Sequence, residues 1–217
     1  MPRNGRNGSS DKAKTQGLYD RIADVQNLAM KINGYRASVA KYLKSLDIEI
    51  TPDSLVLDAG SGTGIVTLAF QDAGFLPQSI IALDISYKSL KVSRDELIKR
   101  KKYADITHAV QGNILKLPFA DNTFDLVLMC GVLEYTPLDE GLREAARILK
   151  KDARLVLLPV KQSMVGSVLE LLYNFKIHPA ENVRREAAEY FRIIDDHEFP
   201  RIEPIAWSKT LFLLEKK

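Results

Sequence analysis

The stretch that decides the fold reads Leu55-Val56-Leu57-Asp58-Ala59-Gly60-Ser61-Gly62-Thr63-Gly64. Its first half predicts a buried strand, because the apolar run is short and is bounded by turn residues. Gly60 and Gly62 permit a tight turn and let a ligand approach bare backbone, and Gly64 lets the next helix start close to the strand. The free N–H groups at that helix start favour a ligand with electron-rich groups. The sequence therefore predicts a strand, a ligand-binding turn and a helix.

An acidic residue follows the glycine turn at the sequence spacing that is typical of ribose binding. Asp84 ends the next predicted strand, 79–84, and stands twenty residues after Gly64. A carboxylate at this spacing can accept hydrogen bonds from the two hydroxyls of a ribose. The glycine turn and Asp84 together indicate a nucleotide-like ligand on a doubly wound sheet.

Strands and helices alternate on both sides of this turn. Short apolar runs predict seven strands, at 54–58, 79–84, 106–111, 124–129, 154–159, 202–207 and 210–215. Helical periodicity predicts helices at 16–32, 35–46, 64–73, 86–101, 137–149 (with Thr136 as N-cap and Pro137 first), 164–175 and 183–195. This alternation predicts an α/β fold with a mostly parallel sheet, and the short connection before the last strand predicts an antiparallel pair at the C-terminus.

Composition excludes several classes of protein. The chain has 217 residues, of which 46% are hydrophobic and 27% charged, so it is neither disordered nor fibrous and can bury a core. No stretch approaches the roughly 20 apolar residues of a membrane span, and no signal-peptide core follows the N-terminus. Cys130 is the single cysteine, which excludes an internal disulfide and a cysteine-cluster zinc site. We expect a reducing, cytoplasmic location and no metal.

The small positive charge is confined to one end of the chain. The net charge is 31 − 28 = +3, and residues 1–14 carry four cations against one anion, so the remainder is formally neutral. A neutral body argues against nucleic acid as a partner. We expect a disordered tail over residues 1–15 and a single domain over 16–217, with N-terminal helices over 16–50 and an insertion after the fifth strand over 160–197.

Six motifs, taken together, resemble the class I S-adenosylmethionine-dependent methyltransferases. They are Val56-Leu57-Asp58-Ala59-Gly60-Ser61-Gly62-Thr63-Gly64, Ala82-Leu83-Asp84-Ile85-Ser86, Gln111-Gly112-Asn113-Ile114, Leu117-Pro118-Phe119-Ala120-Asp121-Asn122-Thr123-Phe124-Asp125-Leu126-Val127, Gly131-Val132-Leu133-Glu134-Tyr135 and Ala146-Arg147-Ile148-Leu149-Lys150. The nearest group acts on quinones, lipids and other small molecules, and residues 18–23 resemble the start of its quinone-biosynthesis members. The resemblance implies a Rossmann-like sheet with N-terminal lid helices.

The resemblance also implies a cofactor site for S-adenosylmethionine and its product S-adenosylhomocysteine. In this family the glycine turn holds the methionine moiety, the acid after the second strand binds the ribose, and the residues after the third strand read the adenine. Carried over, the cofactor-binding residues are Asp58, Gly60, Ser61, Gly62, Gly64, Asp84, Ile85, Ser86, Asn113, Ile114, Cys130 and Gly131. Two departures stand out: Asn113 replaces the commoner aspartate, and Lys151-Asp152-Ala153 replaces Pro-Gly-Gly.

Two other functions stay open. The first is an NAD-dependent oxidoreductase, which the G-x-G-x-G spacing and the long segment before the first strand disfavour. The second is a protein that binds S-adenosylmethionine without turnover, which the sequence does not distinguish from an active methyltransferase. We assign no catalytic residue; Tyr19, Glu134, Tyr135 and His178 are conceivable bases only if the acceptor must lose a proton. Cys130 is better explained as a small buried hydrophobe than as a nucleophile.

The acceptor is expected to be apolar or amphipathic, either a small molecule or a lipid. Apolar residues cover too much of the helix at 164–175 for one core-facing stripe: Val165, Val168, Leu169, Leu171, Leu172, Tyr173 and Phe175, followed by Ile177. We expect this segment to hold the acceptor against the N-terminal helix. The alternatives are packing on the helix at 183–195 and, less favoured, contact with a membrane surface.

Overall fold

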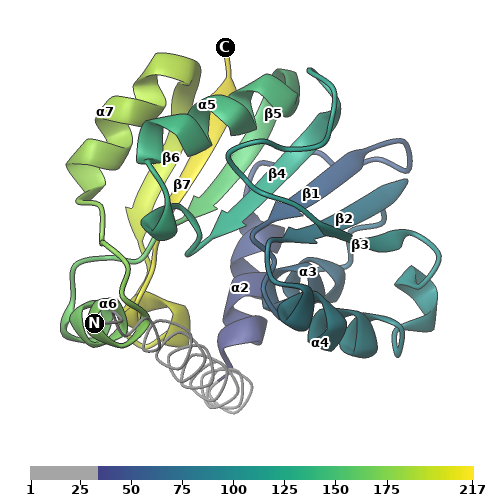
Figure 1. Ribbon diagram of the computed structural model, residues 1–217, viewed down its shortest axis with the longest axis horizontal. Coiled ribbons are helices and arrows are strands. Elements are labelled where there is room, and N and C mark those ends of the chain that lie inside the picture. The colour runs from purple at the N-terminus through teal and green to yellow at the C-terminus, as the bar shows by residue number, and fades with distance from the viewer. Residues whose placement is uncertain (1–33) are drawn as a thin grey trace, which may run out of the picture.

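The computed structural model describes residues 34–217, so the expected tail and the helix at 16–32 lie outside the described residues. Figure 1 shows one seven-stranded sheet with helices on both faces. The strands are β1 (Leu55–Ala59), β2 (Ser79–Asp84), β3 (Thr107–Gln111), β4 (Phe124–Cys130), β5 (Leu149–Leu158), β6 (Phe191–Glu198) and β7 (Thr210–Lys216). The helices are α2 (Tyr35–Ser45), α3 (Ile65–Asp72), α4 (Tyr87–Leu97), α5 (Leu138–Ile148), α6 (Met164–Tyr173) and α7 (Ala180–Tyr190), with 3-10 turns η1 (Lys101–Tyr103), η2 (Leu133–Tyr135) and η3 (Pro204–Trp207).

The sheet has the order β3-β2-β1-β4-β5-β7-β6, and β1 to β5 run parallel. Strand β7 is antiparallel to both of its neighbours, β5 and β6. The expected mostly parallel, doubly wound sheet with an antiparallel C-terminal strand is therefore confirmed. Strand order reverses at β1, which pairs with β2 on one side and β4 on the other. Such a switch point leaves a crevice at the carboxyl ends of the strands.

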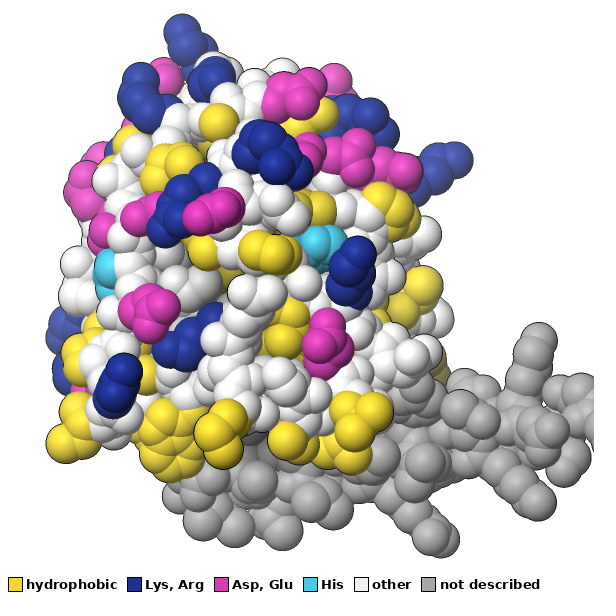
Figure 2. All heavy atoms as spheres, turned by 90° about the vertical axis from the view of Figure 1, so that its left-hand side faces the viewer, with side chains coloured by type: hydrophobic (Ala, Val, Ile, Leu, Met, Phe, Trp, Pro, Cys, Tyr) yellow, Lys and Arg dark blue, Asp and Glu magenta, His cyan; other side chains and the backbone are white. Residues whose placement is uncertain are grey.

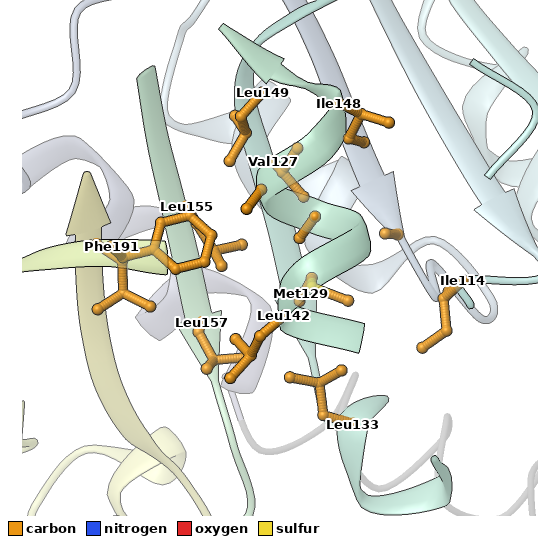
Figure 3. Packing of buried hydrophobic residues seen from close by; sticks show 14 of the residues in the cluster. Ile114, Val127, Met129, Leu133, Leu142, Ile148, Leu149, Leu155, Leu157 and Phe191 are labelled. Carbon is orange, nitrogen blue, oxygen red and sulfur yellow. The ribbon is translucent and has the colours of Figure 1, made fainter. Parts of the chain in front are cut away.

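Alternating side chains of the strands build a core on each face. In β1, Leu57 packs with α5 and α7 on one face, whereas its neighbour Val56 packs with α2 and α3 on the other. Figure 3 shows the first cluster, in which Leu142 of α5 lies against Leu157 and Met129 of the sheet. Both faces of the central strands are covered, which explains why their sequences are continuous apolar runs.

The C-terminal third differs from the prediction. The expected helix at 183–195 ends at Tyr190, and residues 191–198 form the edge strand β6. The expected strand at 202–207 is the 3-10 turn η3, which begins at Pro204, a residue that has no N–H for a sheet ladder. Residues 191–197 of the expected insertion therefore belong to the sheet.

Two smaller expectations are also corrected. Helix α5 starts at Leu138 with Pro137 as N-cap, and the Thr136 hydroxyl donates to the Leu133 carbonyl instead of capping the helix. Strand β5 begins at Leu149, five residues earlier than expected, and passes through Asp152 at φ 60°. Aspartate tolerates this left-handed conformation better than most residues, so it can occupy a position where related sequences have glycine. Within residues 34–217, no helix is both long enough and apolar enough to span a bilayer.

Candidate functional site

A cavity of about 600 Å³ opens at the carboxyl ends of β1, β2 and β4, within the usual size range of small-molecule sites. Ten of the twelve residues carried over from the motifs line it, namely Gly60, Ser61, Gly62, Asp84, Ile85, Ser86, Asn113, Ile114, Cys130 and Gly131. The other two, Asp58 and Gly64, are not among the lining residues. The fold thus brings together assigned residues that are up to 71 positions apart in the chain, from Gly60 to Gly131.

The glycine turn is held by the end of β2. The backbone N–H groups of Gly60 and Ser61 both donate to the Leu83 carbonyl, at 2.8 and 2.9 Å. Gly60 adopts φ 79°, and a Cβ there would overlap the side chain of Val132. Gly62 also has positive φ, but a Cβ there would meet nothing within 4 Å. Backbone at Gly62 is therefore accessible from the cavity, as a close-approaching ligand requires.

Asp84 bonds both to the glycine turn and to the residue that precedes α4. One carboxylate oxygen accepts from the Gly62 N–H at 2.8 Å, and the other accepts from the Ser86 N–H at 2.8 Å. The Ser86 hydroxyl in turn caps α4 by accepting from the Ser89 N–H. A carboxylate offers about four lone-pair directions, so these two bonds leave acceptor capacity toward the cavity.

Asp58 lies behind the turn and is fully buried. One of its carboxylate oxygens accepts from the Thr67 hydroxyl at 2.6 Å, and the other has no hydrogen-bond partner among the described residues. Burial raises the pKa of this carboxyl group to about 7, and the bond from Thr67 offsets only part of the shift. Gly64, also behind the turn, has no room for a Cβ against Ser93 of α4, so it permits close helix packing.

The β2–β3 end of the cavity combines an apolar face with an amide. Ile85 is 68% exposed although it is a large hydrophobic residue, and it lines the cavity. The Asn113 side-chain oxygen accepts from the Leu115 N–H at 2.9 Å, which orients the amide within its turn. Ile114 follows it and is buried. This end can hold a flat heteroaromatic ring between an aliphatic side chain and a polar edge.

The opposite end, toward β5 and β7, is mostly aromatic and apolar. Leu169, Tyr173 and Phe175 of the segment expected to hold the acceptor line the cavity here. Tyr135 also lines it and packs edge-on against Phe175 at a centroid distance of 5.3 Å. Burial raises the pKa of Tyr173 to about 12, so its side chain is neutral.

Of the four conceivable bases, one lies outside the described residues (Tyr19), and Tyr135 lines the cavity. Glu134 and His178 do not line it: the Glu134 carboxylate accepts from the Val160 N–H, and His178 Nε2 lies 3.2 Å from the Leu133 carbonyl oxygen. The Cys130 thiol lies 3.5 Å from the Tyr35 hydroxyl, and burial raises its pKa, which disfavours the thiolate that a nucleophile needs.

Sequence reasoning missed several lining residues, namely Tyr35, Val132, Val160, Ser208 and Lys209. They come from the start of α2, from the segments that follow β4 and β5, and from the turn before β7. None lies in a motif with characteristic spacing, except Val132, which stands inside the segment after β4. For the others, no sequence signal could have placed them at the site.

Comparison with known proteins agrees with this geometry. A methyltransferase domain model matches residues 57–157. The demethylmenaquinone methyltransferase of Lactiplantibacillus plantarum is 34% identical over 151 residues, which are 68% of this chain and 62% of that protein, so the match spans less than two thirds of its length. The ubiquinone/menaquinone biosynthesis C-methyltransferase UbiE of a Shewanella species is 30% identical over 186 residues, 80% of this chain and 71% of that protein.

Solved structures share the fold at low sequence identity. The geranyl diphosphate C-methyltransferase of Streptomyces coelicolor, solved with S-adenosyl-L-homocysteine, has a TM-score of 0.67 and 16% identity, with 82% of this chain and 76% of that chain covered. A Haloferax volcanii methyltransferase, solved with an activator protein, has a TM-score of 0.72 and 17% identity, with 93% and 97% covered. With the motifs, the fold and the relatives in agreement, the chain belongs to the class I S-adenosylmethionine-dependent methyltransferases, in the group that includes the quinone-biosynthesis enzymes.

Proposed function

We propose that this protein transfers the methyl group of S-adenosylmethionine to a small apolar or amphipathic acceptor. The observation that carries the proposal is one continuous cavity, which joins Gly62 and Asp84 at one end to Tyr173 and Phe175 at the other. A polar half that suits the cofactor and an apolar half that suits the acceptor thus meet in a single site.

In the cofactor half, each assigned residue offers the group that its part of the cofactor needs. The Asp84 carboxylate would accept from the ribose hydroxyls, and Ile85 would pack on the adenine, whose edge Asn113 and the Ile114 backbone would read. The open backbone at Gly62 would lie along the methionine moiety. The remaining assigned residues, Asp58, Gly60, Ser61, Gly64, Ser86, Cys130 and Gly131, shape or line this half of the cavity.

The acceptor half has an apolar continuation on the surface. Met164, Val165, Val168, Leu171 and Leu172 of α6 are exposed, Leu171 at 83%, so they are not buried by packing on α7. Figure 2 shows hydrophobic side chains gathered along the edge of the molecule where α6 lies. An exposed apolar patch beside an apolar cavity favours an acceptor that arrives from a lipid phase or from a hydrophobic carrier. The relatives named for menaquinone and ubiquinone support a quinone-like ring as that acceptor.

Catalysis would rest on alignment and on exclusion of water. When bound, S-adenosylmethionine would supply an activated methyl group on its sulfonium, and the cavity would align the acceptor with that group. Burial raises the pKa of Cys130 at the end of β4 and of Tyr35 at the start of α2, so both line the cavity in neutral form and would help to exclude water from the reacting atoms. We assign no general base, because a base is needed only if the acceptor must lose a proton. Of the four conceivable bases, Tyr135 is the one among the described residues that lines the cavity.

The test is methyl transfer from radiolabelled S-adenosylmethionine into fractionated metabolites and lipid extracts, with RNA and DNA as parallel acceptors, at low and high salt. We expect label in the hydrophobic fractions with little dependence on salt, since residues 15–217 have no net charge. Robust methylation of RNA or DNA that is lost steeply as salt rises would contradict the proposal.

Calorimetry distinguishes a methyltransferase from the two other candidate functions, an NAD-dependent oxidoreductase and a cofactor-binding protein without turnover. Binding of S-adenosylhomocysteine but not of NAD is expected for a methyltransferase, and the reverse would indicate an oxidoreductase. Tight cofactor binding with no labelled product in any fraction would identify a binding protein of the same fold.

A further inference from the structure

Lys209 is a buried cation in the wall of the cavity. It precedes β7, its side chain lines the cavity, and the residue is only 6% exposed. Lysine is almost never buried to this degree without a partner, because removing an ammonium group from water is unfavourable. The position of Lys209 therefore requires an explanation.

The backbone places this ammonium group at the end of β4, where the wall of the cavity includes Gly131. Because β7 is antiparallel to β5, the start of β7 lies beside the carboxyl ends of the parallel strands. Lys209 forms a bridge with Val160 just beyond β5, and its backbone N–H donates to the Ile205 carbonyl at 3.0 Å. Its Nζ occupies the space that a side chain at Gly131 would fill, directly after β4.

No group of the described residues is paired with this charge. Lys209 Nζ makes no hydrogen bond or ion pair with them, whereas the less buried Lys161 pairs with Glu198 at 3.1 Å. The Lys209 charge acts on the Cys130 thiol, whose pKa it lowers against the larger raising effect of burial, and that thiol lies 3.5 Å from the Tyr35 hydroxyl. One oxygen of the buried Glu134 carboxylate, also near Cys130, accepts from the Val160 N–H, and the other has no hydrogen-bond partner and forms no ion pair with Lys209 among the described residues.

We propose that Lys209 is the anion-binding residue of the site, and that its ammonium group pairs with an anionic oxygen of a bound small molecule. The inference rests on the proposed function, since it concerns the same cavity. A charge-assisted hydrogen bond in a water-poor pocket orients its partner strongly. Two sources offer this chemistry: the carboxylate of the methionine moiety, and an ionised hydroxyl or carboxyl group on the acceptor.

The first arm of the test compares two ligands by calorimetry. S-adenosylhomocysteine carries the carboxylate, and 5′-methylthioadenosine has the same adenosine and thioether without it. If the cofactor is the source, Lys209→Met weakens S-adenosylhomocysteine roughly tenfold or more and leaves 5′-methylthioadenosine unchanged. Lys150→Met is the matched control, since Lys150 pairs with Asp125 near the amino end of β4, away from the cavity.

The second arm uses protein saturated with S-adenosylhomocysteine and two naphthalene probes of similar size. If the acceptor is the source, Lys209→Met leaves S-adenosylhomocysteine affinity unchanged but weakens 2-naphthoate roughly tenfold, and neutral 2-naphthalenemethanol binds both proteins equally. Lys209→Arg, which keeps the charge, should retain most of the affinity for either anion.

Stability of the ligand-free protein provides an independent readout. Methionine has a similar length and no charge, so Lys209→Met should raise the thermal midpoint by several degrees, whereas Lys150→Met should not. If the affinities of Lys209→Met for S-adenosylhomocysteine and for 2-naphthoate both lie within threefold of wild type, the assignment is overturned, whatever the thermal midpoint. Failure of the wild-type protein to bind S-adenosylhomocysteine would instead refute the proposed function, and the assignment with it.

Discussion

At the scale of the residue, Asp84 has a structural role in addition to the ribose contact that its spacing predicts. Its two carboxylate oxygens already hold the Gly62 and Ser86 N–H groups, so the residue shapes the turn that it serves. Asp84→Ala removes charge-assisted bonds worth roughly 1.5–3 kcal/mol each. We expect the affinity for S-adenosylmethionine to fall at least about tenfold in calorimetry. Asp53→Ala, exposed at the other end of β1, is the control, and equal dissociation constants for the two variants would refute the role of Asp84.

Asp58 predicts a pH dependence of stability. Its pKa is about 7 in the folded protein, raised mainly by burial, against about 3.9 in an unfolded chain. Between these values the folded state holds a proton that the unfolded state has lost, so this group makes the free energy of unfolding fall as pH rises from about 4 to about 7. The loss amounts to roughly 1.4 kcal/mol for each unit by which the two pKa values differ.

Asp58→Asn tests this directly, because the amide retains an acceptor for the Thr67 hydroxyl and does not titrate. We expect urea denaturation to show wild-type stability declining relative to the variant between about pH 4 and 7 and running parallel to it above pH 8. Other titrating groups cancel in the comparison. Parallel curves over the whole range would show that Asp58 is ionised in the fold.

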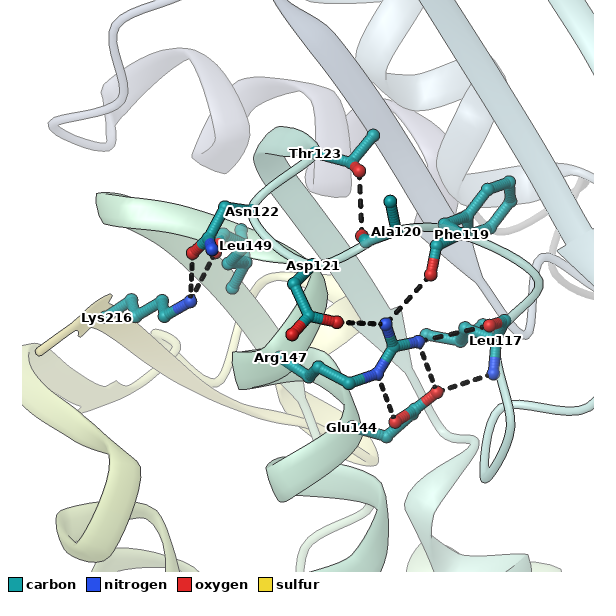
Figure 4. A network of polar contacts seen from close by, with 10 residues as sticks. All are labelled: Leu117, Phe119, Ala120, Asp121, Asn122, Thr123, Glu144, Arg147, Leu149 and Lys216. Atoms are coloured by element: carbon teal, nitrogen blue, oxygen red, sulfur yellow. Dashed lines mark hydrogen bonds and ion pairs between the residues drawn. The ribbon is translucent and has the colours of Figure 1, made fainter.

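At the scale of the element, one arginine ties the loop before β4 to helix α5. Figure 4 shows the Arg147 guanidinium bonded to Glu144 on its own helix, to Asp121 and to the carbonyls of Leu117 and Phe119. The contact to Glu144 raises the Arg147 pKa and lowers that of the carboxyl group. This loop starts at the Asn113 turn, so Arg147 supports the segment that follows the Asn113 end of the cavity.

Arg147→Met leaves two loop carbonyls and a carboxylate without their donor. We expect urea denaturation to report a loss of about 2 kcal/mol in the free energy of unfolding, since these are charge-assisted bonds to a partly exposed group. Arg185→Met is the matched control, because Arg185 is exposed on α7 and bonds to neighbours on the same helix. A loss no greater than that of the control would show that the loop is held by its apolar residues alone.

At the scale of the whole molecule, the net charge of +3 comes from the first fourteen residues, whose structure is not described. They include few apolar residues that could pack on a domain. Deletion of residues 1–14 should leave the thermal midpoint and the affinity for S-adenosylmethionine nearly unchanged, measured by differential scanning fluorimetry and calorimetry. A midpoint lowered by many degrees would show that this segment docks on the folded domain.

The sequence by itself determined the elements whose signals are local. The runs at β1, β2 and β4 are apolar because both faces of a central parallel strand are buried, and Gly60 stands where only a residue without Cβ fits against Val132. Asp84 was assigned from spacing alone, because a strand end and a glycine turn on adjacent parallel strands must meet at one edge of the sheet.

Only the tertiary structure decided the elements whose partners are distant in the chain. Strand β6 carries a bulge between Ile193 and Asp195 and lies at the sheet edge, so its side chains lack the strict alternation that marks a strand, and its pairing with β7 alone defines it. Lys209 reaches the cavity because β7 inserts antiparallel beside β5, a long-range pairing that no spacing near residue 209 encodes. The residues proposed to hold the cofactor could be predicted because each stands in a short motif that marks a strand end or a turn, although their contacts are long-range. Tyr35, Val160, Ser208 and Lys209 stand in no such motif, and only the completed sheet brings them to the cavity.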